Sequence, residues 1–371
     1  MPVTQYDDLV GKRLLHNVAS GNGMMLIPED SILTEAHIEK LEKFNIDLYD
    51  IHVAEVEALP EQMQMISGQE KLPAYDGRSA VHAGDRQHVR SSFGISVLVK
   101  QASAKLNEIE QIIITTGKVP VAEVSEHVLP TLMEATQNRN VYKLFADLRA
   151  EEDFRFKHSI GVAFMSALLG RWLGMDEQET ALLTTAASLC DVGTIRLPGS
   201  ILHKTDSLLA HETEIMKQHT KLGYDMLVES GVEQRIARVA LQHHEREDGS
   251  GYPAKLRGDQ IDRFGKIVAI ADVYMAMASD RPQRPALPFY QVLQNLHSDI
   301  IHNRLDSGIG MTFLNRLMSA QVGSDVLLTN GQRGRIVLIH PNYPTQPLIA
   351  LESGFIDLSK TDAVHMKEIF G

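Results

Sequence analysis

Eleven consecutive residues, His243–Pro253, combine metal-binding groups with helix-breaking residues. They read His-His-Glu-Arg-Glu-Asp-Gly-Ser-Gly-Tyr-Pro. Two adjacent imidazoles followed by three carboxylates are a concentrated set of metal ligands and general acid or base groups. Glycine and proline then interrupt helical structure. The stretch therefore predicts a polar cluster where a helix ends in a tight loop. The alternative is a surface turn with both histidines solvated.

Length and charge limit the kinds of protein that this chain can be. Its 371 residues predict two to four domains. The net charge of −12 argues against sequence-independent nucleic-acid binding, and we expect no sequence-specific nucleic-acid partner either. No apolar run reaches the roughly 18–20 residues that span a bilayer. The N-terminus lacks signal-peptide features and the single cysteine fits a reducing compartment, so we expect a cytoplasmic protein.

Apolar periodicity divides the chain into five segments. Residues 1–58 predict a small β-β-α-β module, with a hairpin turn at residues 20–23. Residues 59–92, which are polar and rich in proline and glycine, predict a linker. Residues 93–148 predict a helical lead-in that could form a dimer contact, and residues 149–320 predict a mainly helical domain. Short β-type runs separated by turn signals predict a small β domain over residues 321–371.

One further acid stands out on physical grounds alone. Asp272 lies inside the run Val-Ala-Ile-Ala-Asp-Val-Tyr, which is otherwise apolar. An unpaired carboxylate is costly to bury, so this residue predicts a metal ion or a basic partner nearby.

The stretch His243–Pro253 resembles the signature of the HD-GYP family, which are bacterial signalling phosphodiesterases of the HD superfamily that hydrolyse cyclic di-GMP. The match is carried by His243, His244, Glu245, Asp248, Gly249, Gly251, Tyr252 and Pro253. The resemblance implies an all-helical, metal-dependent phosphohydrolase core, flanked here by a small α/β N-terminal module and a small β C-terminal domain. It also implies the product, linear pGpG, with GMP as a further product left open.

The same resemblance implies a set of metal ligands, which are His158, Asp191, His219, His243, His244 and Asp272. Four imidazoles and two carboxylates suit iron, manganese or another borderline divalent ion. A pair of ions about 3.5–4 Å apart would use all six, with Asp191 as the bridging carboxylate. The resemblance further implies phosphate contacts from Arg281 and Arg284, while Tyr252 could brace its loop or meet substrate.

Two positions depart from the family pattern. Cys190 stands where the family has the histidine of its His-Asp pair, so it is either a thiolate ligand or a buried neutral thiol. Thr194 replaces a lysine that in the family faces the scissile phosphate. The resemblance implies that position 194 and Asp191 are the two catalytic positions. The loss of one such contact typically costs roughly 10²–10³ in rate.

These departures leave two functions open. The first is a slowed cyclic di-GMP phosphodiesterase. The second is a catalytically weak relative that binds metal or cyclic di-GMP and signals through protein partners, contacted by its Gly-Tyr-Pro loop or its terminal domains.

Overall fold

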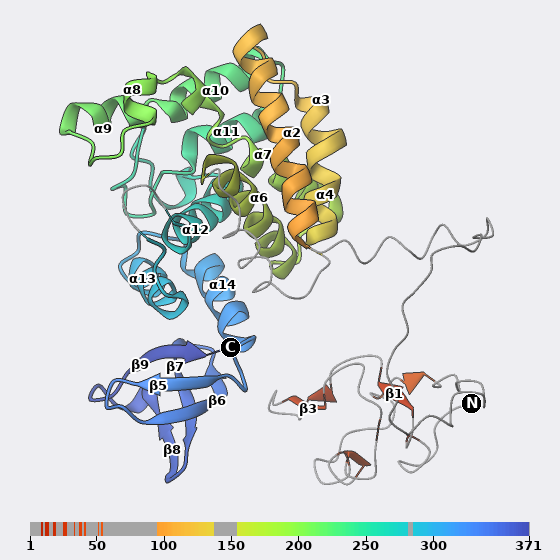
Figure 1. Ribbon diagram of the computed structural model, residues 1–371, viewed down its shortest axis with the longest axis vertical. Helices are drawn as coiled ribbons and strands as arrows, with labels where there is room; N and C mark the ends of the chain where they lie inside the picture. The colour runs from red at the N-terminus through yellow and green to blue at the C-terminus, as the bar shows by residue number, and fades with distance from the viewer. Residues whose placement is uncertain are drawn as a thin grey trace, which may run out of the picture. The chain divides into compact units, whose positions relative to one another are not determined.

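The computed structural model describes residues 95–136, 154–280 and 285–370, together with short pieces between residues 9 and 54 (Figure 1). The chain divides into two compact units, Met1–His82 and Ala83–Gly371. The predicted linker, residues 59–92, lies outside the described residues.

The first unit contains two small antiparallel strand pairs. Its strands are β1 (Arg13–Leu14), β2 (Val18–Ala19), β3 (Met25–Ile27) and β4 (Val53–Ala54). β1 pairs with β4, and β2 pairs with β3, with Val18 opposite Ile27. The hairpin turn predicted at residues 20–23 lies outside the described residues. Leu14, Ile27 and Leu41 are fully buried and belong to one apolar core. Non-local pairing of β1 with β4 therefore closes this small module around its own core.

The second unit begins with a helical bundle. Its helices are α2 (Ile95–Thr116), α3 (Val121–Glu123), α4 (Leu129–Ala135), α6 (Phe154–Trp172), α7 (Glu177–Ser188), α8 (Gly199–Leu202), α9 (Ala210–Lys217), α10 (His219–Glu229), α11 (Gln234–Gln242), α12 (Arg263–Ala278), α13 (Phe289–Ile301) and α14 (Ser307–Ser319). A π-helical stretch, Val124–Val128, joins α3 to α4, and 3₁₀ turns follow α7 (Val192–Arg196) and precede α12 (Gly258–Gln260). 

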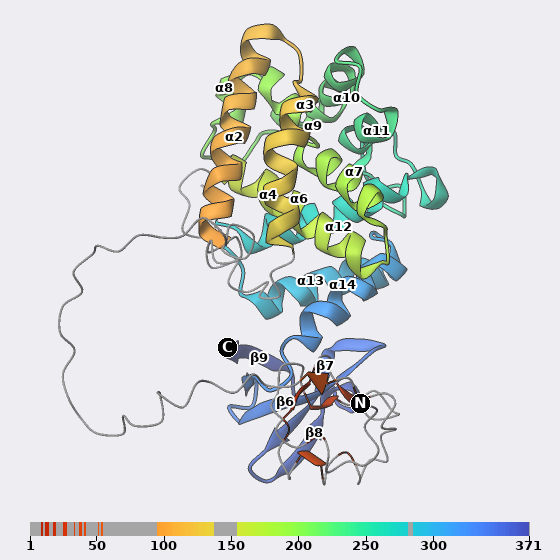
Figure 2. The same cartoon turned by 90° about the vertical axis from the view of Figure 1, so that its right-hand side faces the viewer.

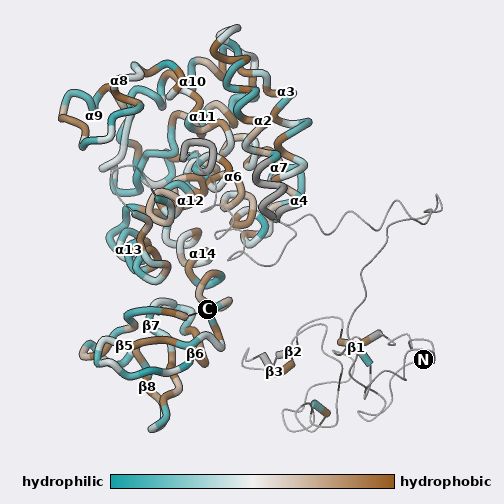
Figure 3. The backbone as a smooth tube through the Cα atoms, viewed as in Figure 1, coloured by the Kyte–Doolittle hydropathy of each residue, from teal (hydrophilic) through white to brown (hydrophobic). Residues whose placement is uncertain are grey.

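The centre of this bundle is the pair α6 and α12, which pack directly against each other. Both helices are rich in buried apolar residues, which is typical of helices in a core. Figure 3 shows hydrophobic residues along α6. They approach closely, because a Cβ atom added at Gly161 would lie 2.2 Å from Cε of Met275. Asp262 caps α12 by accepting a hydrogen bond from the backbone N–H of Phe264 at 2.9 Å.

The chain ends in a five-stranded antiparallel sheet that packs against α13 and α14 (Figures 1 and 2). Its strands are β5 (Asp325–Leu328), β6 (Arg333–His340), β7 (Tyr343–Leu351), β8 (Gly354–Asp357) and β9 (Met366–Phe370), in the order β8-β7-β6-β5-β9. Val326 pairs with both Gly334 and Ile369, so β5 lies between β6 and β9. The Tyr290 hydroxyl donates a hydrogen bond to the Thr345 carbonyl at 2.7 Å, which ties α13 to β7.

The predicted fold class, a helical HD-type core followed by a small β domain, is confirmed. Among the helices within the described ranges, none is both long and apolar enough to cross a membrane.

Candidate metal centre

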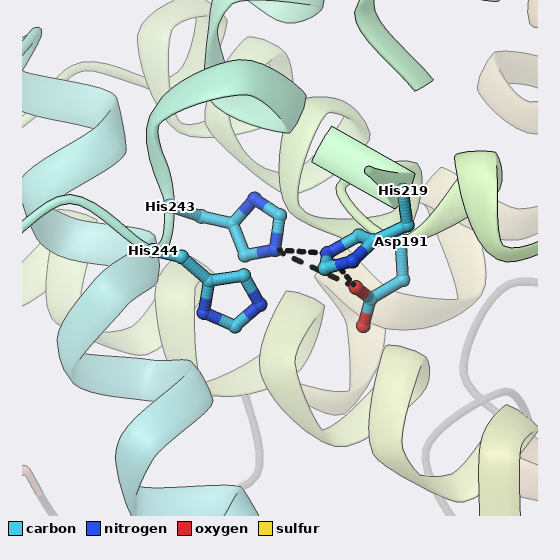
Figure 4. A group of neighbouring side chains, drawn as sticks. All are labelled: Asp191, His219, His243 and His244. Atoms are coloured by element: carbon cyan, nitrogen blue, oxygen red, sulfur yellow. Dashed lines mark hydrogen bonds and ion pairs between the residues drawn. The ribbon is translucent and has the colours of Figure 1, made fainter. Parts of the chain in front are cut away.

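Five segments of the second unit bring the six predicted ligands together. Asp191 lies in the turn after α7, His219 is the first residue of α10, and His243 and His244 directly follow α11. His158 comes from α6 and Asp272 from α12. Figure 4 shows three of the imidazoles gathered around the Asp191 carboxylate, with His219 and His243 joined to it by dashed lines.

His219, His243 and Asp191 form the first half of this site. Nε2 of His219 lies 3.3 Å from Oδ1 of Asp191, and Nε2 of His243 lies 3.5 Å from the same oxygen. The two Nε2 atoms are 3.4 Å apart. Ligand atoms of these three residues and of His244 all lie within 4.8 Å of one another.

Backbone carbonyls fix the orientation of these two imidazoles. Nδ1 of His219 donates to the Met216 carbonyl at 2.8 Å, and Nδ1 of His243 donates to the Ala240 carbonyl at 3.0 Å. A carbonyl can only accept, so each Nδ1 carries a proton, and Nε2 is the nitrogen that faces Asp191 and offers its lone pair when the ring is neutral. Two lone pairs and a carboxylate oxygen therefore converge on one point, an arrangement that a cation stabilises. Metal-ligating histidines typically show this outer hydrogen bond.

His158, Asp272 and His244 form the second half. Nε2 of His158 lies 2.8 Å from Oδ1 of Asp272, and Nδ1 of His244 lies 3.6 Å from the other oxygen of that carboxylate. His158 is also 3.9 Å from Oδ2 of Asp191. The two oxygens of Asp191 thus face different histidines, as a carboxylate shared between two ions would.

The site keeps its carboxylates ionised despite their burial. Burial raises the pKa of Asp191, but the hydrogen bond from His243 and the nearby imidazoles lower it well below its usual value. Burial likewise raises the pKa of Asp272, and the hydrogen bond from His158 outweighs that effect. Burial lowers the pKa of His219 and His244, which favours the neutral imidazoles that a metal needs.

The Gly-Tyr-Pro loop is held against the end of α11 by a buried acid. Glu245 is 2% exposed and accepts hydrogen bonds from the backbone N–H groups of Ala254 at 2.7 Å and Leu256 at 2.9 Å. The N–H of Tyr252 donates to the His244 carbonyl at 3.2 Å. The loop therefore folds back onto the segment that carries both histidines.

Glycine is required where this loop turns. A Cβ atom at Gly251 would lie 2.5 Å from Cα of Glu245 and from the backbone nitrogen of Arg246. Gly249 has φ +76°, in the left-handed region that favours glycine. Asp248 supports the turn, because its carboxylate accepts a hydrogen bond from the Ser250 N–H at 2.8 Å.

Tyr252 braces the second imidazole of the pair. Its ring stacks on His244, with centroids 4.8 Å apart and planes at 27°. Nζ of Lys217 lies 5.5 Å from the centroid of the Tyr252 ring. Burial raises the pKa of the Tyr252 phenol, so the group stays protonated and can donate a hydrogen bond.

The two departures from the family pattern occupy different surroundings. Cys190 is 1% exposed and belongs to the apolar core, and burial raises the pKa of its thiol well above the usual value. A neutral thiol is a poor metal ligand. Thr194 faces the pocket described next, and its hydroxyl donates to the Asp191 carbonyl at 2.7 Å.

A pocket of about 700 Å³ opens onto the metal-binding residues. Its lining includes five of the predicted ligands, His158, Asp191, His219, His244 and Asp272, and also Leu106, Ile109 and Ile113 of α2. Two cationic residues, Lys204 and Arg246, also line it, and sequence reasoning gave neither a role. Arg246 lies within the His243–Pro253 stretch and could have been singled out there. The sequence around Lys204 contains no motif that indicates a role in the pocket.

Arg281 and Arg284, the predicted phosphate contacts, lie outside the described residues.

Comparison with known proteins agrees with this geometry. Residues 137–309 match the HD domain family. The chain is 39% identical over 141 residues to the cyclic di-GMP phosphodiesterase response regulator RpfG of Xanthomonas campestris, covering 37% of each chain. It is 36% identical over 169 residues to a cyclic di-GMP phosphodiesterase of Thermotoga maritima, covering 45% of each. It is 32% identical over 206 residues to 3'3'-cGAMP-specific phosphodiesterase 2 of Vibrio cholerae, covering 54% of this chain and 39% of the relative.

The part of the helical bundle that carries the histidine and aspartate cluster, within residues 137–309, therefore has the fold of an HD domain. Over this region, which includes the Gly-Tyr-Pro loop, the chain is similar to proteins named as cyclic dinucleotide phosphodiesterases. The chain spans less than half the length of each of these three relatives.

Proposed function

We propose that this protein is a metal-dependent phosphodiesterase that hydrolyses cyclic di-GMP to linear pGpG. The observation that carries the proposal is the approach of Nε2 of His219 and Nε2 of His243 to one oxygen of Asp191, beside a pocket large enough for a ligand of this size. The names of the relatives support the choice of a cyclic dinucleotide as substrate.

The donor set supports two divalent ions, iron or manganese. Imidazole nitrogens with carboxylate oxygens suit such borderline metals better than calcium, which prefers oxygen alone. His219, His243 and one oxygen of Asp191 would hold one ion. The second would be held by His158, His244, Asp272 and the other oxygen of Asp191. The chemistry that such ions supply when bound is a lowered pKa for an attacking water and a counter-charge for the phosphate oxygens.

The remaining residues of the pocket would bind and orient the dinucleotide. Leu106, Ile109 and Ile113 are 3–6% exposed and give α2 an apolar surface on which a base can lie. Arg246 places a guanidinium in the pocket wall, where Nη1 donates to the Glu245 carbonyl at 2.9 Å. We propose that Arg281 and Arg284 add phosphate contacts from the segment between α12 and α13.

A second candidate is a binding protein that holds cyclic di-GMP without efficient turnover. The observation that favours it is the side chain at position 194. The Thr194 hydroxyl is engaged with the Asp191 carbonyl, and it brings no positive charge to the pocket. The negative charge that develops on the phosphate in the transition state would therefore not be stabilised by a cation at position 194.

Turnover of cyclic di-GMP by protein purified without oxygen separates the two candidates, with iron and manganese quantified in the same sample. Cys190→His, Thr194→Lys and the double variant would be measured beside the wild type, with Asp191→Asn as the blank. We expect about two ions per chain and hydrolysis by the wild type. Hydrolysis by the double variant alone would favour the binding protein. A wild type with neither metal, turnover nor affinity for cyclic di-GMP would contradict both.

A further inference from the structure

We propose that Lys204 is a phosphate-binding residue of the pocket, which supplies the positive charge that position 194 does not. The inference rests on the proposed function, because it assigns a contact to the same cyclic dinucleotide.

Lys204 is held in a fixed place by an acid on the next helix. It follows α8, and its Nζ lies 2.5 Å from Oε2 of Glu212 in the first turn of α9. The same Glu212 oxygen accepts the backbone N–H of Leu209 at 2.7 Å. The two side chains are 23% and 17% exposed, so this is a half-buried contact rather than a solvated surface pair.

The segment that carries Lys204 connects two parts of the metal centre. It begins after the 3₁₀ turn with Thr194 and ends where His219 opens α10, and Figure 1 shows α8 and α9 beside α10. Lys204 lines the same pocket as Asp191, Thr194 and His219. Lys204 therefore belongs to the wall of the cavity that the metal-binding residues also line.

The described lining of the pocket offers one alternative cation. Arg246 is directed back toward its own loop, because its Nη1 donates to the carbonyls of Glu245 at 2.9 Å and His243 at 3.4 Å. Lys204 is anchored by a side chain instead, and Glu212 orients the ammonium without removing its charge. A phosphodiester with two anionic phosphates needs such a group away from the metal ions.

Equilibrium binding measures this role without turnover. Cyclic di-GMP would be titrated into protein depleted of metal by a chelator, using wild type, Lys204→Met and Lys204→Arg. We expect Lys204→Met, which keeps the apolar stem, to raise the dissociation constant about tenfold. Lys204→Arg keeps the charge and should recover most of the affinity. Lys221→Met, a change at an exposed lysine paired with Asp225, is the matched control.

Rescue from position 194 distinguishes a phosphate contact from a structural ion pair. In the metal-loaded protein, Lys204→Met should lower kcat/KM by about 10–100-fold. Adding Thr194→Lys to that variant should raise kcat/KM again by at least about tenfold, because the new amine enters the same pocket. If Lys204 only anchored α9, Thr194→Lys would not restore kcat/KM. Lys204→Met would then lower the melting temperature instead.

The outcomes separate this inference from the proposed function. Equal dissociation constants and equal kcat/KM for wild type and Lys204→Met, at equal metal content, would overturn the role of Lys204 and leave the phosphodiesterase proposal standing. Wild-type protein that binds cyclic di-GMP but neither retains metal nor hydrolyses it would contradict the phosphodiesterase, and the binding series would still decide the role of Lys204. A wild type without affinity for cyclic di-GMP would overturn both.

Discussion

Nε2 of His158 lies 2.8 Å from Oδ1 of Asp272, although the two residues are 114 positions apart. The contact joins α6 to α12, the two helices at the centre of the bundle, near the close approach of Gly161 and Met275. Half of the candidate metal centre is therefore built on two helices of the buried core. The positions of His158 and Asp272 are therefore set by the packing of α6 against α12, and close packing in the core limits how far either side chain can move.

Replacing Asp272 by Asn should separate metal binding from folding. The amide keeps the size of the carboxylate but removes the charge that faces His158 and His244. We expect metal affinity to fall at least about 10–100-fold, as it does when supporting carboxylates are removed. Metal content after dialysis is the measurement. Asp225→Asn, at an exposed acid paired with Lys221, is the control, and unchanged metal content in Asp272→Asn would rule out a ligand role.

Cys190→Ala should leave the metal content unchanged. The thiol is buried in the apolar core and its pKa is raised, so it packs as a small neutral side chain. We expect a loss of about 1 kcal/mol in the free energy of unfolding, from the removed sulfur atom, and no loss of bound iron or manganese. Chemical denaturation and metal analysis of one preparation test both parts. Depletion of one ion in Cys190→Ala would identify the thiol as a ligand.

Gly251→Ala should disturb the loop that carries Tyr252. The new methyl group would lie 2.5 Å from backbone atoms of Glu245 and Arg246, which cannot rotate away. We expect destabilisation of about 1–3 kcal/mol together with a loss of turnover. Gly199→Ala is the matched control, since its Cβ atom would meet a side-chain atom of His203 at 3.6 Å, an ordinary contact. Equal melting temperatures for wild type and Gly251→Ala would contradict the packing.

The metal-free protein should lose stability as the pH falls, in part through His244. Burial lowers the pKa of this imidazole well below its usual value. The unfolded chain takes up a proton near pH 6.5, so below that pH the unfolded state binds more protons than the folded state. This part of the stability is complete above about pH 6.5 and is lost as the pH falls toward the folded pKa, by at most about 1.4 kcal/mol per pH unit.

A variant isolates that contribution from its neighbours. His219 acts with the same sign, while His243 opposes it because its hydrogen bond to Asp191 outweighs burial and raises its pKa. As the pH falls from about 7.5 to about 5.5, the melting temperature of His244→Asn should therefore rise relative to that of the wild type, both measured with a chelator present. His365→Asn, at an exposed imidazole, serves as the control. A constant difference between wild type and His244→Asn would show that the imidazole does not titrate as inferred.

The membership of the site could be predicted, but its arrangement could not. The sequence singles out His243 and His244 because they are adjacent, and Asp272 because its neighbours are apolar. The structure brings these three residues together with His158, Asp191 and His219. The backbone carbonyls that orient the imidazoles could not be read from sequence, because every residue offers a carbonyl. Glu245 was recognised as part of a motif, whereas its two hydrogen bonds to the loop depend on tertiary folding.

The β domain shows a similar limit. Turn signals and β-type runs mark its strands, and Asn330-Gly331 does form a turn, with Gly331 at φ +83°. The order β8-β7-β6-β5-β9 could not be predicted, because the return of β9 to pair with β5 is a long-range choice. The dimer contact predicted for residues 93–148 stays a prediction.

The wall that α2 contributes to the pocket lies ahead of residue 137, where the match to the HD domain begins. Leu106, Ile109 and Ile113 therefore lie outside the matched region, whereas the histidines and aspartates of the candidate metal centre lie within it. An HD domain cut at its family boundary and grafted onto another chain would carry the histidines and aspartates but leave one side of the cavity behind. The ligand set and the shape of the cavity thus come from two different stretches of the chain, and substitutions on α2 can change the cavity without altering any of the histidines and aspartates.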